Sequence, residues 1–163
     1  MPILIFLSQH IKRAIDVNLS GEARRQLASS GWFEDRNVDT ADFEKLCREN
    51  GYPILDEVLR FVRKFSGIAG EHKAFRVSAM DRFDFNSCQA IRNIPKERVD
   101  VYSIRFGQLM VPVGEAYNSH LILMVSSGGN LLGAYDDFLC ELGDSIEEGL
   151  TVLFESNENK IIS

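Results

Sequence analysis

The chain has 163 residues, 45% of them hydrophobic, which excludes a disordered chain and suffices for a domain that folds without a metal or a disulfide. Its net charge of −6 argues against the basic stripe by which nucleic-acid-binding domains hold phosphates. No apolar run approaches the roughly 20 residues of a membrane-spanning helix, and the run over residues 2–7 is too short for a signal-peptide core. We therefore expect one domain over residues 1–163 that contacts neither nucleic acid nor a membrane.

Helical spacing of apolar residues dominates the first part of the chain. It predicts four helices, over residues 9–17, 20–29, 39–49 and 54–65. Ser20 and Thr40 are the expected N-caps of the second and third helices, because a side-chain oxygen there accepts a backbone N–H that the helix leaves unpaired. Gly31 and Gly67 are expected to follow helix ends.

The period then changes to two, which predicts a strand over residues 74–79 after a polar loop that contains His72. Asn86 is the expected N-cap of a short helix that ends near Arg92, and residues 101–106 fit either a helix or a strand. Three further strands are predicted over residues 109–113, 120–125 and 131–135, the last two joined by a hairpin turn.

A final helix is predicted after Asp144, where Glu147 stands three residues on and completes a capping-box pattern. Helices at both ends with hairpin-linked strands between them are typical of an α+β fold. We expect N-terminal helices packed on a mostly antiparallel sheet, with one C-terminal helix.

Charge is unevenly distributed along the chain. Residues 106–159 contain no Lys or Arg and nine acidic residues: Glu115, Asp136, Asp137, Glu141, Asp144, Glu147, Glu148, Glu155 and Glu158. Such a segment repels nucleic acid and attracts basic partners, although composition alone favours a solvated surface that aids solubility. Two of the acids, Glu147 and Glu148, are also explained by the positive end of the helix dipole.

The sequence carries no signature of catalysis or of a cofactor site. It contains no Walker loop, no GxGxxG, no GxSxG and no HExxH. The pair Asp81 and Asp84 is better explained by a turn than by a metal site, because further ligands are missing. The three cysteines form no CxxC pair and fit a reducing compartment, so we expect a cytoplasmic protein without metal, cofactor or catalytic residues.

Three segments in series resemble a known family. They are residues 31–39 (GWFEDRNVD), the apolar helix 55–65 followed by SGI, and the run from PVGE at 112–115 through the Gly-Gly turn to GDSIEEGL at 143–150. Their order resembles the third bacterial immunity subfamily of the SUKH superfamily, over about residues 20–155. Residues 1–18 have no counterpart.

The resemblance implies helices packed on a curved, mostly antiparallel sheet and a protein that binds and blocks a toxin. The toxins of such systems are often nucleases or nucleic-acid deaminases. The motif residues Trp32, Arg36, Pro112 and Gly114 are then expected to be structural. We expect Trp32 to anchor the core, Arg36 to pair with a carboxylate or a carbonyl, and the other two to shape a strand end and a tight turn.

The expected partner-binding residues are Glu115, Asp136, Asp137 and Glu141, with the last three placed in a loop after the strand 131–135. A nuclease site is basic because it holds phosphates, so an acidic surface can occupy it. Two alternatives stay open: an interaction scaffold of the same fold without a toxin partner, and a small enzyme with an unrecognised site.

Overall fold

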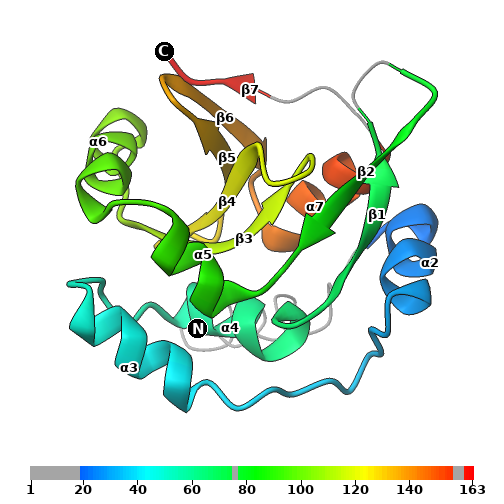
Figure 1. Ribbon diagram of the computed structural model, residues 1–163, viewed down its shortest axis with the longest axis horizontal. Helices are drawn as coiled ribbons and strands as arrows, with labels where there is room; N and C mark the ends of the chain where they lie inside the picture. Colours follow the sequence, from blue (N-terminus) through cyan, green and yellow to red (C-terminus); the bar gives the residue numbers. More distant parts are fainter. Residues whose placement is uncertain (1–18, 75–76, 156–159) are drawn as a thin grey trace, which may run out of the picture.

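The structure, a computed structural model, describes residues 19–74, 77–155 and 160–163 (Figure 1). This part of the chain forms six helices: α2 (Gly21–Ser29), α3 (Ala41–Glu49), α4 (Asp56–Phe65), α5 (Ser87–Asn93), α6 (Lys96–Phe106) and α7 (Ile146–Glu155). It also forms seven strands: β1 (Ala69–Lys73), β2 (Met80–Asp84), β3 (Met110–Ala116), β4 (Leu121–Ser126), β5 (Leu131–Tyr135), β6 (Phe138–Gly143) and β7 (Lys160–Ile161). The helix predicted over residues 9–17 lies outside the described residues.

The seven strands form one sheet in the order of the sequence, and each pairs antiparallel with the next. The predicted α+β class with a mostly antiparallel sheet is therefore confirmed. The helices are less segregated than expected, because α5 and α6 lie between β2 and β3 in the chain. Figure 1 shows α6 and α2 at opposite ends of the long axis of the molecule.

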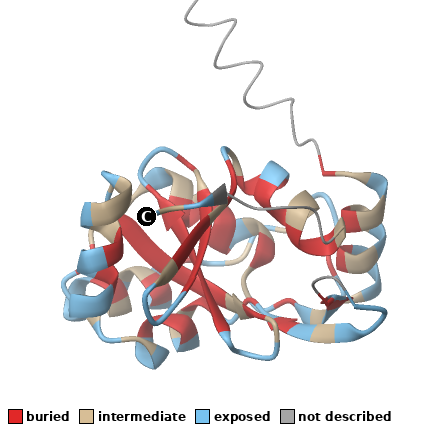
Figure 2. Ribbon diagram, turned by 90° about the horizontal axis from the view of Figure 1, so that it is seen from above, coloured by how far each residue is buried: buried red, intermediate tan, exposed pale blue. Residues whose placement is uncertain are grey.

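The sheet is covered on both faces. Leu131 of β5 faces α7, where Gly149 approaches it, whereas Ala134 lines a hollow together with Tyr102 of α6. Side chains alternate between the faces of a strand, so residues three apart in β5 point to opposite faces. Helices α6 and α7 therefore lie on opposite sides of β5, and buried residues follow the strands between them (Figure 2).

Aromatic rings fill much of the core. Phe83 lies 4.6 Å from Phe85 and 5.1 Å from Phe154 of α7, and Phe85 meets Phe61 of α4 at 5.4 Å between ring centroids. The last two contacts are edge-to-face, and such contacts add to the large hydrophobic gain of burying aromatic rings. The cluster joins β2, α4 and α7, which are far apart in the sequence.

Two of the expected helix caps are confirmed. The side chain of Ser20 accepts the N–H of Ala23 at 3.1 Å, and that of Asn86 accepts the N–H of Gln89 at 3.0 Å. Thr40 is the N-cap residue of α3 but makes no side-chain cap hydrogen bond, because its hydroxyl donates to Glu44 instead.

The cap of α7 differs by one residue from the prediction. Ser145, not Asp144, accepts the backbone N–H at the helix start, and the donor is Glu148 at 3.1 Å. The Glu148 carboxylate in turn accepts the N–H of Asp144 at 3.1 Å. Glu147 is thereby free to turn toward another helix.

The strand predicted over residues 74–79 is wrong for its described residues, 74 and 77–79, which belong to neither β1 nor β2. Those two strands pair from Ala69–Asp84 to Lys73–Met80. His72, expected in a polar loop, is fully buried on β1. Strand β6 was also missed: it contains Glu141, which was expected in a loop. Strand β3 runs three residues past its predicted end at Val113.

Candidate partner-binding surface

The turn between β5 and β6 is held by one face of α6. The carbonyl oxygen of Asp136 accepts the Tyr102 hydroxyl at 2.6 Å and an Arg98 N–H at 3.2 Å. The carbonyl oxygen of Asp137 accepts an N–H of Arg105 at 2.9 Å. The three donors are spaced by four and three residues, so they share one side of the helix. This face of α6 fixes the backbone of the turn, in which Asp136 adopts a left-handed conformation with φ of 45°.

A surface hollow of about 260 Å³ lies between α5, α6 and the sheet. Both Glu115 and Asp136 line it, together with apolar and aromatic residues. The lining residues are Asn93, Ile94, Pro95, Arg98, Tyr102, Glu115, Ser119, His120, Ile122, Ala134, Tyr135 and Asp136. The structure thus brings two of the four expected partner-binding residues to one place.

Two exposed apolar side chains also lie on α6. Ile104 is 81% exposed and Val101 is 52% exposed. Val101 stands three residues after Arg98 and four before Arg105, so it is their neighbour on the helix surface. An isolated exposed apolar residue is ordinary, but adjacent ones rimmed by charge are typical of protein-binding surfaces. We call the hollow, the β5–β6 turn and these two residues the α6 surface.

Glu141 lies outside the α6 surface. On β6, Glu141 pairs with Leu132 of β5. The β5–β6 turn begins after the pair Tyr135–Phe138, which lies about 10 Å along the hairpin from the Glu141–Leu132 pair. The Glu141 carboxylate accepts an N–H of the Asn130 side chain at 2.9 Å, near the β4–β5 turn. The expectation that it lies in a loop with Asp136 and Asp137 is therefore wrong.

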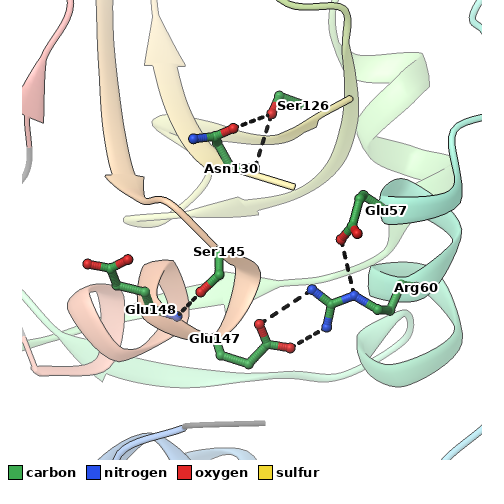
Figure 3. Close-up of polar contacts among 7 residues, drawn as sticks. All are labelled: Glu57, Arg60, Ser126, Asn130, Ser145, Glu147 and Glu148. Carbon is green, nitrogen blue, oxygen red and sulfur yellow. Dashed lines mark hydrogen bonds and ion pairs between the residues drawn. The ribbon is translucent and has the colours of Figure 1, made fainter. Parts of the chain in front are cut away.

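Other acids of the C-terminal third serve the fold. Glu147 is 5% exposed and its carboxylate contacts the guanidinium of Arg60 in α4, as Figure 3 shows. Arg60 also contacts Glu57 at 3.2 Å. The acidic segment has no basic residues of its own, but basic residues of α4 and α6 contact it in the fold. Of the acids in this segment that the structure describes, those at the α6 surface are Glu115, Asp136 and Asp137.

None of the four family-motif residues lines the hollow. Trp32 is buried and stacks on Phe65 with ring centroids 6.0 Å apart. The guanidinium of Arg36 donates to the carbonyl oxygens of Lys64 at 3.2 Å and Ser66 at 2.5 Å. Carbonyl groups at the C-terminal end of a helix have no hydrogen-bond partner within the helix, and Arg36 supplies one here. A side chain from an earlier loop thus closes the C-terminus of α4.

Pro112 and Gly114 flank an irregularity inside β3, where the pairing with β4 shifts. A Cβ atom at Gly114 would lie 3.0 Å from the carbonyl oxygen of Asp84, so glycine allows β2 to approach β3 closely. The tight turn comes later, at Tyr117–Ser119, where three residues have positive φ. The expectation that Pro112 and Gly114 form the strand end is therefore wrong.

The buried titratable groups are poor catalysts. Burial raises the pKa of the Cys47 and Cys140 thiols to about 12, so both stay protonated near neutral pH. His72 accepts the N–H of Tyr117 at 3.1 Å and contacts the carbonyl of Lys73 at 2.9 Å, which fixes it within the fold. Within residues 19–74, 77–155 and 160–163, no group of three His, Cys, Asp or Glu side chains could hold a metal. The helices of this part are too short or too polar to cross a membrane.

The fold and this surface define an α+β protein whose exposed features are those of a protein-binding domain: a rigid turn, a hollow and apolar side chains on one helix. The model of the SUKH-3 immunity protein family matches residues 19–156, and the chain belongs to this family. Neither the curated proteins nor the solved structures gave a match. The family assignment supports a role as an immunity protein, a class that acts on a toxin partner.

Proposed function

We propose that this protein neutralises a cognate toxin domain by binding it through the α6 surface and occluding its active site. The observation that carries the proposal is the β5–β6 turn, which presents Asp136 and Asp137 on a backbone held by three side chains of α6. A surface that is already ordered loses little conformational entropy on binding. The adjacent Val101 and Ile104 supply apolar area that a partner can bury.

The toxin chemistry that fits this surface is that of a nuclease or a nucleic-acid deaminase. Such an enzyme needs a basic site to hold phosphates, and carboxylates at a rigid turn complement that charge. Charge complementarity also speeds association, which favours capture of the toxin before it reaches nucleic acid. We further propose that the protein acts in the cytoplasm as one domain over residues 1–163, without catalysis and without a cofactor.

Co-expression tests the antidote role. The chain is produced together with the toxin-like domain encoded beside its gene, and cell survival is compared with a control that produces the toxin-like domain alone. Survival with the chain present is the expected result. If cells die while both proteins are soluble, this chain is not the antidote of that toxin.

Charge reversal tests the proposed surface. We expect the double variant Asp136→Lys/Asp137→Lys to weaken toxin binding at least about tenfold, because two attractive contacts become repulsive. The matched control is Asp35→Lys/Glu49→Lys, which changes two exposed acids elsewhere by the same charge. Isothermal titration measures both affinities. Equal affinities of the two variants would place the interface elsewhere.

A further inference from the structure

The size of the hollow beside Glu115 and Asp136 limits what can occupy it. Its volume of about 260 Å³ falls below the roughly 300–1,000 Å³ of pockets that bind drug-sized ligands. A metal ion is also a poor match, because no group of three potential ligands lies within the described residues. The remaining candidate occupant is a single long side chain of a protein partner. Protein interfaces commonly bury one such side chain in a pocket.

The walls of the hollow are suited to a side chain with an apolar stem and a flat, positive head. Ile94, Ile122 and Ala134 provide apolar lining. Tyr135 also lines the hollow, at the end of β5.

Two carboxylates supply the polar partners. Glu115 Oε1 accepts an N–H of the Asn93 side chain at 2.6 Å, which orients the carboxylate and leaves Oε2 able to accept. Asp136 is held through its backbone carbonyl by Tyr102 and Arg98, and no described residue makes a hydrogen bond or an ion pair with its carboxylate. Two carboxylates match the forked donors of a guanidinium better than the single point of an ammonium.

Arg98 opposes this arrangement because it also lines the hollow and carries a positive charge. One of its N–H groups is already directed to the carbonyl of Asp136. The two carboxylates outnumber it, so Glu115, Asp136 and Arg98 together carry a charge of about −1. The excess charge therefore favours a cationic occupant.

We propose that the hollow between α6 and the sheet receives one arginine side chain of the toxin domain, with its guanidinium between Glu115 and Asp136. The inference rests on the proposed function and names the chemistry of its central contact. An arginine that binds phosphate in a nuclease or deaminase cannot do so while it is bound in this hollow.

The hollow can be tested without the toxin. N-acetylarginine amide is titrated into the isotope-labelled full chain, and the resonances of the Asn93 side chain and of Tyr135 are followed. We expect saturable shifts with a dissociation constant on the order of millimolar, as befits one isolated contact. N-acetylcitrulline amide, which has nearly the same shape without the charge, is expected to shift these resonances far less.

The variant Glu115→Gln/Asp136→Asn removes both charges and keeps the local structure. Gln can still accept from Asn93, and Asn tolerates the left-handed conformation at position 136. We expect about a tenfold loss of arginine amide binding or more, while the control Glu49→Gln on α3 binds as the unaltered chain does. Absence of a saturable shift at the hollow, or equal binding by both variants, overturns the inference.

The toxin domain separates this inference from the proposed function. The same double variant is expected to bind the toxin-like domain of the adjacent gene at least about tenfold more weakly than the unaltered chain. If toxin affinity is unchanged, the arginine inference fails and the proposed function stands. If even the unaltered chain does not bind that toxin, the proposed function fails for the pair, and the arginine titration decides the chemistry of the hollow.

Discussion

Arg60 of α4 and Glu147 of α7 form an ion pair that joins two helices 87 positions apart in the chain. Both Glu147 oxygens face the guanidinium, the second at 3.4 Å, and Glu57 contacts the same guanidinium from the other side (Figure 3). Glu147 is therefore part of the framework, although the sequence places it in the acidic segment. The pair also explains why the first turn of α7 is oriented toward α4.

We expect Glu147→Gln to lower the free energy of unfolding by about 1–3 kcal/mol. Loss of one partner of a buried pair costs about 3–5 kcal/mol, and the partly exposed Arg60 reduces that figure through solvent screening. Urea unfolding measures the change. The double variant Arg60→Met/Glu147→Leu should recover much of the loss, because no uncompensated charge remains. Full stability of Glu147→Gln would show that the pair contributes nothing.

Gly149→Ala is expected to destabilise the protein even though alanine is the better helix former. Within a helix the exchange normally gains up to about 1 kcal/mol. Here the new Cβ would lie 2.5 Å from the Cβ of Leu131, and overpacking of this kind costs about 1–3 kcal/mol. A lower melting temperature is the expected result. In the control Gly21→Ala, the nearest atom is 3.7 Å away, so the melting temperature should stay unchanged or rise.

The sequence predicted those elements whose signals are local. Ser20 and Asn86 cap their helices as expected, and the strand over residues 131–135 has the predicted bounds. Strand β1 was missed because its sequence, AGEHK, is nearly all small or polar. The burial of His72 in that strand depends on the N–H of Tyr117, a partner 45 positions away that no local pattern reveals.

The candidate site was predicted only in part for a similar reason. Sequence charge identified Glu115, Asp136 and Asp137, but it could not show that Glu147 pairs with Arg60 or that Glu141 binds Asn130. The contribution of α6 was missed because residues 101–106 fitted a helix or a strand. Arg98, Tyr102 and Arg105 are spaced by four and three residues, which places them on one face of a helix. That spacing could indicate a shared surface only once the segment was known to be helical.

The stability of the protein is expected to fall as the pH drops below about 6.5, through His72. Burial lowers the pKa of His72 from its ordinary value, against smaller opposing effects of the Lys73 carbonyl and Asp81. Above pH 6.5 both folded and unfolded states are neutral at this residue. Below it the unfolded chain takes up the proton first, so folding loses stability until the folded state also titrates.

Urea unfolding at pH 7.5 and pH 5.0 measures this dependence. His72→Gln should be less stable than the unaltered chain at pH 7.5. Its free energy of unfolding should also fall less between pH 7.5 and pH 5.0 than that of the unaltered chain. The matched control is His120→Gln, which changes an exposed histidine. An unaltered pH dependence in His72→Gln would assign the effect to other groups.

Ile104→Ser is expected to separate binding from stability. The side chain is 81% exposed and serine has a similar helix propensity, so the free energy of unfolding should change by no more than about 0.5 kcal/mol. If the α6 surface meets the toxin, burial of Ile104 contributes about 1.5–3 kcal/mol, and affinity should fall by about tenfold to a hundredfold. The matched control is Phe33→Ser, an exposed apolar residue just after α2, which lies at the opposite end of the molecule from α6 (Figure 1). Calorimetric titration with the toxin-like domain compares the two variants. Weaker binding by Phe33→Ser alone would move the interface to the α2 end, because the two substitutions remove comparable exposed apolar surface.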